Sequence, residues 1–257
     1  MYLRRPLLCL GLLATALVHA ATFTTTSSET HPLSRNGKVR IQNANGSISI
    51  RTWDRAEVSI QVEKVGSSEE FLEAIDVEIT SEPDSISITT SKPKSEWDWH
   101  DLLDWNWGRD RQGQVRLTLM VPAMAQLDRI ALVNGSIALE ETHGLVNVST
   151  DNGSIRATGL HEGALKTVNG SIQAGVDQLA TTTQLTVATV NGSVTIRLPK
   201  AVGASVNLAT INGGISCNLP LETETDVSRT RLIGVLGSGD GSIRVKCING
   251  GVRLESL

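Results

Sequence analysis

The sequence is poor in aromatic residues, with only two Phe and one Tyr beside five Trp among 257 residues. A globular β-sandwich usually fills its core with some aromatic side chains, whereas the stacked coils of a solenoid can use rows of aliphatic ones. Long helical patterns are also scarce. In their place stand 23 glycines and an abundance of Thr, Ser, Val and Ile, which indicates β-structure with many turns.

Long apolar runs are confined to the start of the chain. Arg4 and Arg5 precede the apolar segment Leu7–Leu17, and Val18-His19-Ala20 offers a small-residue cleavage site. This pattern predicts a signal peptide over residues 1–20 and export to the periplasm or the extracellular surface. The segment is too short to span a bilayer, so no transmembrane segment is expected after cleavage.

Basic charge is in short supply, since 23 basic residues face 27 acidic ones and the formal net charge is −4. Loss of Arg4 and Arg5 with the signal peptide would make the chain more acidic. No basic stripe stands out in the sequence, which argues against nucleic acid as a partner.

Cysteine is scarce as well: Cys9 lies in the signal segment, and only Cys217 and Cys247 remain after it. An oxidising compartment favours bonding of such a pair. Both share the parity of the inward aliphatic residues Ile215 and Val245. They could therefore form a disulfide between neighbouring coils or lie there as two buried free thiols.

A short turn motif recurs eight times. Asn-Gly-Ser-Ile or a close variant places Asn or Asp before Gly, and this pair lets the chain bend sharply because Gly adopts left-handed backbone angles freely and Asn tolerates them. The eight pairs are Asn45-Gly46, Asn134-Gly135, Asn152-Gly153, Asn169-Gly170, Asn191-Gly192, Asn212-Gly213, Asp240-Gly241 and Asn249-Gly250.

Alternating aliphatic residues follow the turns, as in Ile137-Ala138-Leu139, and several glycines lie nine residues apart. This spacing predicts one strand per nine-residue unit and two units per coil, with aliphatic side chains stacked inward between parallel strands. Antiparallel hairpins are the alternative, since Asn-Gly also favours type I′ turns. The near-constant phase of the repeat favours an all-β, flattened right-handed β-helix-like solenoid over residues 127–257.

Residues 36–126 predict a smaller N-terminal strand-rich part, preceded by a flexible or weakly extended lead-in at 21–35. Ser67–Ala74 has the capping pattern of a short helix. The apolar alternation on both sides of Glu82-Pro83-Asp84-Ser85 predicts a β-hairpin.

The segment 92–113 interrupts the strand pattern and holds four of the five tryptophans, namely Trp97, Trp99, Trp105 and Trp107. Such a segment could cap an open end of the solenoid, contact an envelope protein or surface, or bind a glycan. Asp98, His100 and Asp104 within it lack a recognised metal-ligand spacing. The turns also lack the carboxylates of calcium-binding nonapeptide repeats, so we expect no metal and no cofactor.

Catalytic motifs are missing from the sequence. His31, His100, His143 and His161 do not stand in a motif beside a nucleophile, and Glu140 and Glu141, as neighbours on a strand, face opposite ways. We therefore expect no enzyme. The alternative is a carbohydrate-active solenoid with an acidic site on an outward sheet face.

The motifs together resemble those of the bacterial DUF4097 family, whose members are also labelled adhesins. The resemblance rests on the strand Val115–Pro122 and on Leu132-Val133-Asn134-Gly135-Ser136-Ile137, and it covers most of residues 36–257. It implies an extracytoplasmic β-solenoid-like domain and supplies no catalytic residues. We expect an exported, adhesin-like binding or structural module of the envelope, with an unidentified protein or glycan partner and an open oligomeric state.

Overall fold

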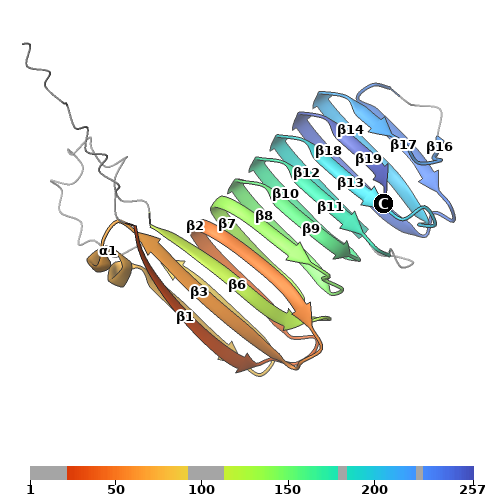
Figure 1. The fold of residues 1–257 in the computed structure, drawn as a ribbon. Helices are drawn as coiled ribbons and strands as arrows, with labels where there is room; N and C mark the ends of the chain where they lie inside the picture. Colours follow the sequence, from red (N-terminus) through yellow and green to blue (C-terminus); the bar gives the residue numbers. More distant parts are fainter. Residues whose placement is uncertain (1–21, 92–112, 179–183, 224–227) are drawn as a thin grey trace, which may run out of the picture.

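The computed structural model describes residues 22–91, 113–178, 184–223 and 228–257. The predicted signal peptide at 1–20 and the tryptophans Trp97, Trp99, Trp105 and Trp107 lie outside these ranges. Within them, 19 strands and one short helix form a long stack in which all strands belong to a single sheet (Figure 1).

Each coil of the stack consists of two strands joined by an Asn-Gly corner. First strands pair in parallel with first strands, and second strands with second strands, so that the stack has two faces that we call the first and second arms. The coils are β8 (Leu145–Asn152) and β9 (Ile155–Leu160), β10 (Glu162–Asn169) and β11 (Ile172–Val176), β12 (Gln184–Asn191) and β13 (Val194–Leu198), β14 (Ala204–Asn212) and β15 (Ile215–Cys217), and β18 (Gly241–Asn249) and β19 (Val252–Ser256). This arrangement confirms the predicted all-β class and parallel solenoid.

The core lies between the two arms and is built by strict alternation. In β12, for example, Leu185, Val187 and Thr189 are buried while the residues between them are more exposed. Aliphatic side chains from successive coils therefore stack in continuous rows. In the described ranges no Phe, Tyr or Trp is among the buried core residues, which accounts for the aromatic-poor composition.

The order of coils in the stack departs from their order in the sequence. Strand β18 pairs in parallel with both β12 and β14, and β19 pairs with both β13 and β15. The last coil of the chain therefore lies between the β12–β13 coil and the β14–β15 coil. Figure 1 shows this directly, because the violet-blue strands β18 and β19 interrupt the colour sequence from teal to blue.

The N-terminal part is continuous with the repeat region. Strands β2 (Lys38–Trp53) and β7 (Gln126–Glu140) each pass through a corner and contribute to both arms, and they pair in parallel along nearly their whole length, Asn45 beside Asn134. The boundary predicted at residues 126/127 thus falls within one continuous sheet, in which β2 forms a coil directly beside β7.

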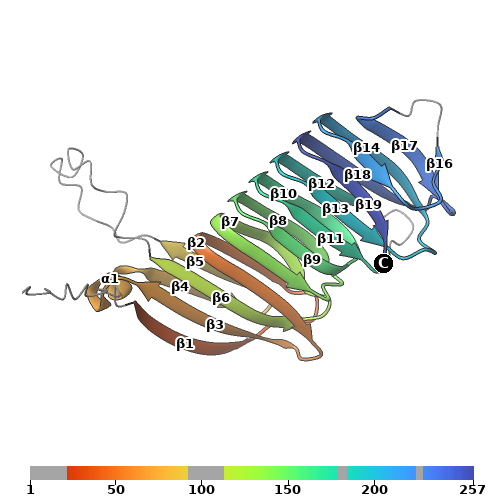
Figure 2. The same ribbon diagram turned by 45° about the horizontal axis from the view of Figure 1, so that its top comes forward.

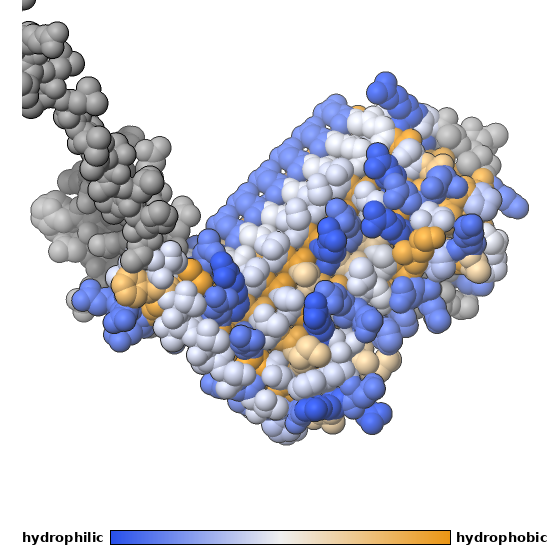
Figure 3. All heavy atoms as spheres, viewed as in Figure 1, coloured by the Kyte–Doolittle hydropathy of each residue, from blue (hydrophilic) through white to orange (hydrophobic). Residues whose placement is uncertain are grey.

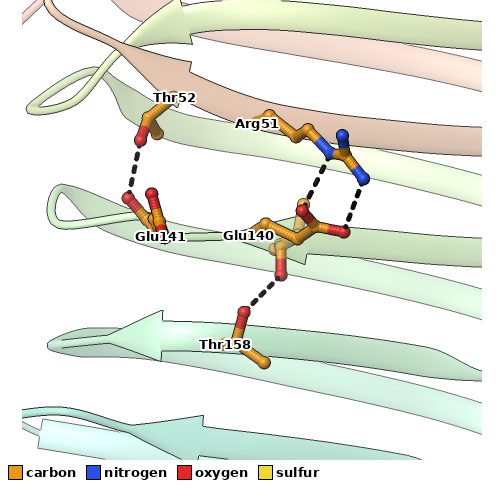
Figure 4. A network of polar contacts seen from close by, with 6 residues as sticks. Arg51, Thr52, Glu140, Glu141 and Thr158 are labelled. Atoms are coloured by element: carbon orange, nitrogen blue, oxygen red, sulfur yellow. Dashed lines mark hydrogen bonds and ion pairs between the residues drawn. The ribbon is translucent and has the colours of Figure 1, made fainter.

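Polar contacts on the second arm reinforce this junction (Figure 4). Arg51 of β2 pairs with Glu140 of β7 through its Nε at 2.8 Å and its Nη2 at 3.2 Å. The Thr52 hydroxyl donates to the Glu141 carbonyl at 2.9 Å, and Thr158 of β9 donates to the Leu139 carbonyl at 3.4 Å. These bonds tie three neighbouring coils together across the predicted boundary.

Shorter antiparallel elements cover both ends of the stack (Figure 2). At the N-terminal end of the stack, β5 and β6 pair in parallel with the first and second halves of β2. Beyond them the pairing is antiparallel, β6 with β3, β3 with β1 and β5 with β4; at the other end β17 pairs with β14 and β16 with β17. The bounds are β1 (Phe23–Pro32), β3 (Glu57–Gly66), β4 (Asp76–Glu82), β5 (Ser85–Ser91), β6 (Gln114–Pro122), β16 (Glu222–Thr223) and β17 (Arg231–Leu236).

The predicted lead-in at 21–35 differs from the structure, which places the ten-residue strand β1 there. Thr and Ser favour extended backbone, and the open edge of β3 supplies the hydrogen bonds that order the segment. The predicted helix is confirmed as α1 (Glu69–Ala74), where the Ser68 hydroxyl accepts from the Phe71 amide at 3.2 Å. The β4–β5 hairpin is confirmed as well.

Candidate binding edge

Seven asparagines lie in one line along the outer edge where the corners stack, which we call the corner edge. In each neighbouring pair one side-chain Nδ2 donates to the Oδ1 of the next asparagine, at 2.7–2.9 Å, and six such bonds make an unbroken ladder. Its order in space is Asn45, Asn134, Asn152, Asn169, Asn191, Asn249, Asn212. The hydrophilic row along the straight outer edge of the stack in Figure 3 follows these corners.

The ladder leaves part of each amide free for a partner. An Asn side chain carries two N–H donors and an oxygen with two lone pairs. Inside the ladder one donor and one acceptor position serve the neighbouring asparagines. Each inner asparagine therefore presents a further donor and acceptor to the outside, repeated about every 4.8 Å along the stack.

Glycine follows each of these asparagines because the coils approach too closely for a side chain. A Cβ atom on Gly153 would overlap the carbonyl oxygen of Gly135, and one on Gly135 would overlap that of Gly46. The same overlap recurs at Gly170, Gly192, Gly250 and Gly213. Gly135 also has a φ of 137°, a conformation that L residues rarely adopt.

A buried hydroxyl row lies two residues before the asparagines. Thr167 and Thr189 donate to the carbonyl oxygens of Gly153 and Gly170 in the adjacent coils, at 3.0 and 3.1 Å. Cys247 occupies the same row beside Thr189 and Thr210, and its Sγ lies 3.4 Å from the Gly192 oxygen. Burial raises the pKa of the Cys247 thiol, partly opposed by its hydrogen bond with Thr210.

The register separates the two cysteines that could have formed a disulfide. Cys217 of β15 lies beside Leu254 of β19 on the second arm, seven residues and one corner away from Cys247 on the first arm. Both are free thiols in the structure. Cys217 is partly buried and Cys247 is buried, so the structure has the second of the two alternatives, two free thiols that face the core from different arms.

One of the eight predicted turns lies elsewhere. Asp240-Gly241 opens β18, where Gly241 is in register with Ala204 at the far end of the first arm from the corner. The Asp240 carboxylate accepts a hydrogen bond from the Ser238 hydroxyl and takes no part in the ladder. The corner of this coil is Asn249-Gly250.

Exposed aliphatic side chains accompany the ladder, and sequence reasoning missed them. The residue before each ladder asparagine points outward, and it is 44% exposed at Val133, 41% at Val168, 40% at Ile248 and 66% at Ile211. Val190 stands at the same place in its coil but is half-buried, while Ala44 and Asp151 stand at the two other rungs. The recurrence of Val-Asn-Gly and Ile-Asn-Gly was the available signal, because alternation places that residue opposite to the core.

The edge opposite the corners is irregular and carries a histidine pair. His143 and His161, in successive turns, stack with ring centroids 4.8 Å apart and planes 4° from parallel. Burial lowers the pKa of His161, and the charge of His143 lowers it further, while Asp177 and Glu162 act in the opposite direction.

Outward carboxylates mainly form ion pairs along the sheet. Glu140 pairs with Arg51, Asp128 with Arg40 at 2.7 Å, and Glu255 with both Arg197 and Arg253. Glu141 lies in a turn with a φ of 57°. Among the described residues no group of three His, Cys, Asp or Glu side chains is arranged to hold a metal ion.

The fold and the corner edge define the class of protein: an all-β parallel solenoid with one long amide-lined edge. The chain belongs to the Toastrack DUF4097 family, whose model matches residues 30–255. No curated protein matches the sequence. In the described part of the chain, no helix has the length and apolar character needed to cross a membrane.

Several solved structures are similar to this chain. One described as a "putative cell adhesion protein" from Clostridium sporogenes is 12% identical, with a TM-score of 0.54 over 91% of this chain and 100% of the other. A "putative adhesin" from Bacteroides fragilis is 11% identical, with a TM-score of 0.29 over 91% and 97% of the two chains. At these identities, the first likeness establishes a shared fold.

Proposed function

We propose that this protein is an exported, non-enzymatic binding or structural module of the cell envelope, which acts through a long repeated surface. The observation that carries the proposal is the corner edge, where seven in-line amides form one continuous strip beside five outward Val or Ile residues. Such a strip suits an extended contact rather than the enclosed site that holds a small molecule.

Two further observations support this function. The signal-like segment at residues 1–20 is of the kind that directs export. The similar Clostridium sporogenes protein is described as a "putative cell adhesion protein", and that chain is covered in full. The Trp-rich segment, with Trp97, Trp99, Trp105 and Trp107, remains a second proposed contact with an envelope protein or glycan.

The experiment is a pull-down from envelope extract with three proteins. The first is the natural chain, the second carries Ile211→Thr and Ile248→Thr on the corner edge, and the third carries Ala at the four tryptophans. Threonine keeps the β-branched shape and strand preference while it removes the apolar surface. We expect the edge variant to lose most of the captured envelope components.

The outcomes assign the contact. Loss of capture only in the tryptophan variant would move the contact to segment 92–113. Identical capture by all three proteins, or capture of nothing by the natural chain, would contradict a binding module that uses either surface. Hydrolysis of envelope polysaccharide by the natural chain would instead favour the carbohydrate-active alternative.

A further inference from the structure

We propose that the corner edge docks onto the surface of an anionic lipid bilayer, with its aliphatic row at the level of the headgroups and its basic residues on the lipid phosphates. This inference rests on the proposed function and names the partner of the same surface.

The first argument is the apolar content of the corner edge. Five of the seven rungs carry an outward Val or Ile, and Ile211 is the most exposed at 66%. Four of them stand at neighbouring rungs, namely Val168, Val190, Ile248 and Ile211. Contiguous apolar groups that project from an edge mark an interaction surface. Interfacial membrane binding requires such an apolar contribution in addition to charge.

The second argument is the charge of the outward rows that flank the corners. On the first arm Lys166 and Lys246 stand three residues before Asn169 and Asn249; on the second arm Arg156 and Arg253 stand four residues after Asn152 and Asn249. All four are exposed, and Arg253 also pairs with Glu255 at 3.4 Å.

Acidic residues are nearly missing from these rows. In the outward positions from three residues before to four residues after each ladder asparagine, Asp151 is the one acid on the described coils. The edge is therefore net positive, whereas the whole chain has a formal net charge of −4. Such a local reversal of sign is complementary to an anionic surface.

The third argument is shape. The corners lie in a straight line along one outer edge of the stack in both views (Figures 1 and 2). Six intervals of about 4.8 Å give this line a length of roughly 29 Å. A projecting straight edge can rest on a flat surface, and its free amide groups can bond to headgroup oxygens. Long Lys and Arg side chains on both arms can reach the same plane.

The test is co-sedimentation with vesicles, using the chain from Ala21 onward so that the apolar segment Leu7–Leu17 does not contribute. All the described strands lie between Phe23 and Ser256, so this chain contains every one of them. The probes are vesicles of phosphatidylcholine with phosphatidylglycerol and vesicles of phosphatidylcholine alone. We expect binding to the anionic vesicles that weakens at high salt.

Three variants report on the parts of the edge. Lys166→Gln with Lys246→Gln removes two charges, and we expect binding to weaken at least about fivefold. Val168→Thr with Ile211→Thr and Ile248→Thr removes apolar surface, and we expect a similar loss. Arg35→Gln with Lys200→Gln makes the same charge change in exposed turns away from the corners; binding should change less than about twofold.

Circular dichroism and urea unfolding check that each variant keeps the fold. Equal binding to neutral vesicles, or equal losses in the charge variant and its control, would overturn the proposal. So would binding to soluble dextran sulfate that is unaffected by the threonine substitutions, since this would indicate a site for anionic glycans. Sedimentation without vesicles would indicate a second copy of the chain as partner. If vesicles do not bind but the edge still captures an envelope component, the proposed function stands and only the lipid surface is wrong.

Discussion

Each residue of the Asn-Gly corner has a separate physical task. The asparagine links coils through its side chain, as Asn169 does by donating to Asn152 and accepting from Asn191. The glycine permits the coils to approach, because its neighbour in the next coil is a carbonyl oxygen where a Cβ would stand. The identity of the glycine is thus dictated by space between coils as well as by the bend within one coil.

This distinction leads to a prediction for Gly153→Ala. The new methyl group would overlap the Gly135 oxygen, and we expect the free energy of unfolding to fall by about 2–4 kcal/mol, the range of severe single substitutions. Urea unfolding followed by circular dichroism measures this change.

Gly175→Ala is the matched control. Gly175 lies in β11, and the atoms nearest to the place that an added methyl group would occupy are 3.7 Å away, an ordinary contact. Its substitution should alter the free energy of unfolding by less than about 1 kcal/mol. If Gly153→Ala were equally mild, close approach between coils would not explain the glycine.

At the scale of elements, the two ends of each strand are under different constraints. The corner ends stack in constant register, whereas the opposite turns vary in length and sequence, as between β9 and β10 or β13 and β14. The His143–His161 pair lies on this variable side. Because the pKa of His161 is lowered in the folded protein, we expect the effect of this pair on the free energy of unfolding to depend on pH.

The pH prediction follows from the lowered pKa of His161. The folded protein favours the neutral imidazole because of burial, so this stabilising contribution is present above the unfolded pKa of 6.5 and is lost as the pH falls through and below that value. We expect the free energy of unfolding to decrease between pH 7.5 and pH 5, with a smaller decrease in His161→Gln.

Urea unfolding at several pH values tests this expectation. His143→Gln should reduce the slope only in part, since burial, the larger cause, remains. His31→Gln, in β1 at the end of the stack, should leave the slope unchanged. An unaltered slope in His161→Gln would show that the pair does not control the pH dependence.

The strands could be predicted from the sequence, but the role of each turn could not. The alternation of apolar and polar residues in segments such as Leu185-Thr186-Val187 predicts a half-buried strand, and this pattern can be recognised from a few adjacent residues alone. Asp240-Gly241 has the same local form as the corners, yet it opens β18 because the coil closes at Asn249-Gly250. That choice depends on which asparagine meets Asn191 and Asn212 in space. Once the corners are known, the alternation of side chains along a strand is enough to place Val133, Val168 and Ile211 on the outside of the stack.

At the scale of the whole molecule, the chain closes its stack by insertion. After β14 and β15 the chain adds β16 and β17 at the end of the first arm, and β18 and β19 then return to occupy the position between the β12–β13 and β14–β15 coils. The spacing of the repeats does not encode this order. Strands β12 and β14 both align with β18 in the same register, with Asn191 and Asn212 beside Asn249, so the same register would also allow β12 and β14 to pair with each other. The inserted coil consequently joins the two parts of the stack.

A truncation after Asp240 tests the importance of that coil. It removes β18 and β19 and separates β12 from the strand group β14 and β17, so we expect loss of cooperative urea unfolding and exposure of the aliphatic rows, detected by a hydrophobic dye. Deletion of residues 22–32 is the comparison, because among the described strands β1 pairs only with β3 and nearly all its side chains are exposed. We expect it to lower stability modestly and to preserve cooperativity. In a solenoid whose coils follow the sequence, loss of the last coil would be as mild as loss of a terminal strand. If the truncated chain unfolds cooperatively near the natural midpoint, then β14 has paired directly with β12, Asn212 beside Asn191, and the inserted coil is dispensable for closure of the stack.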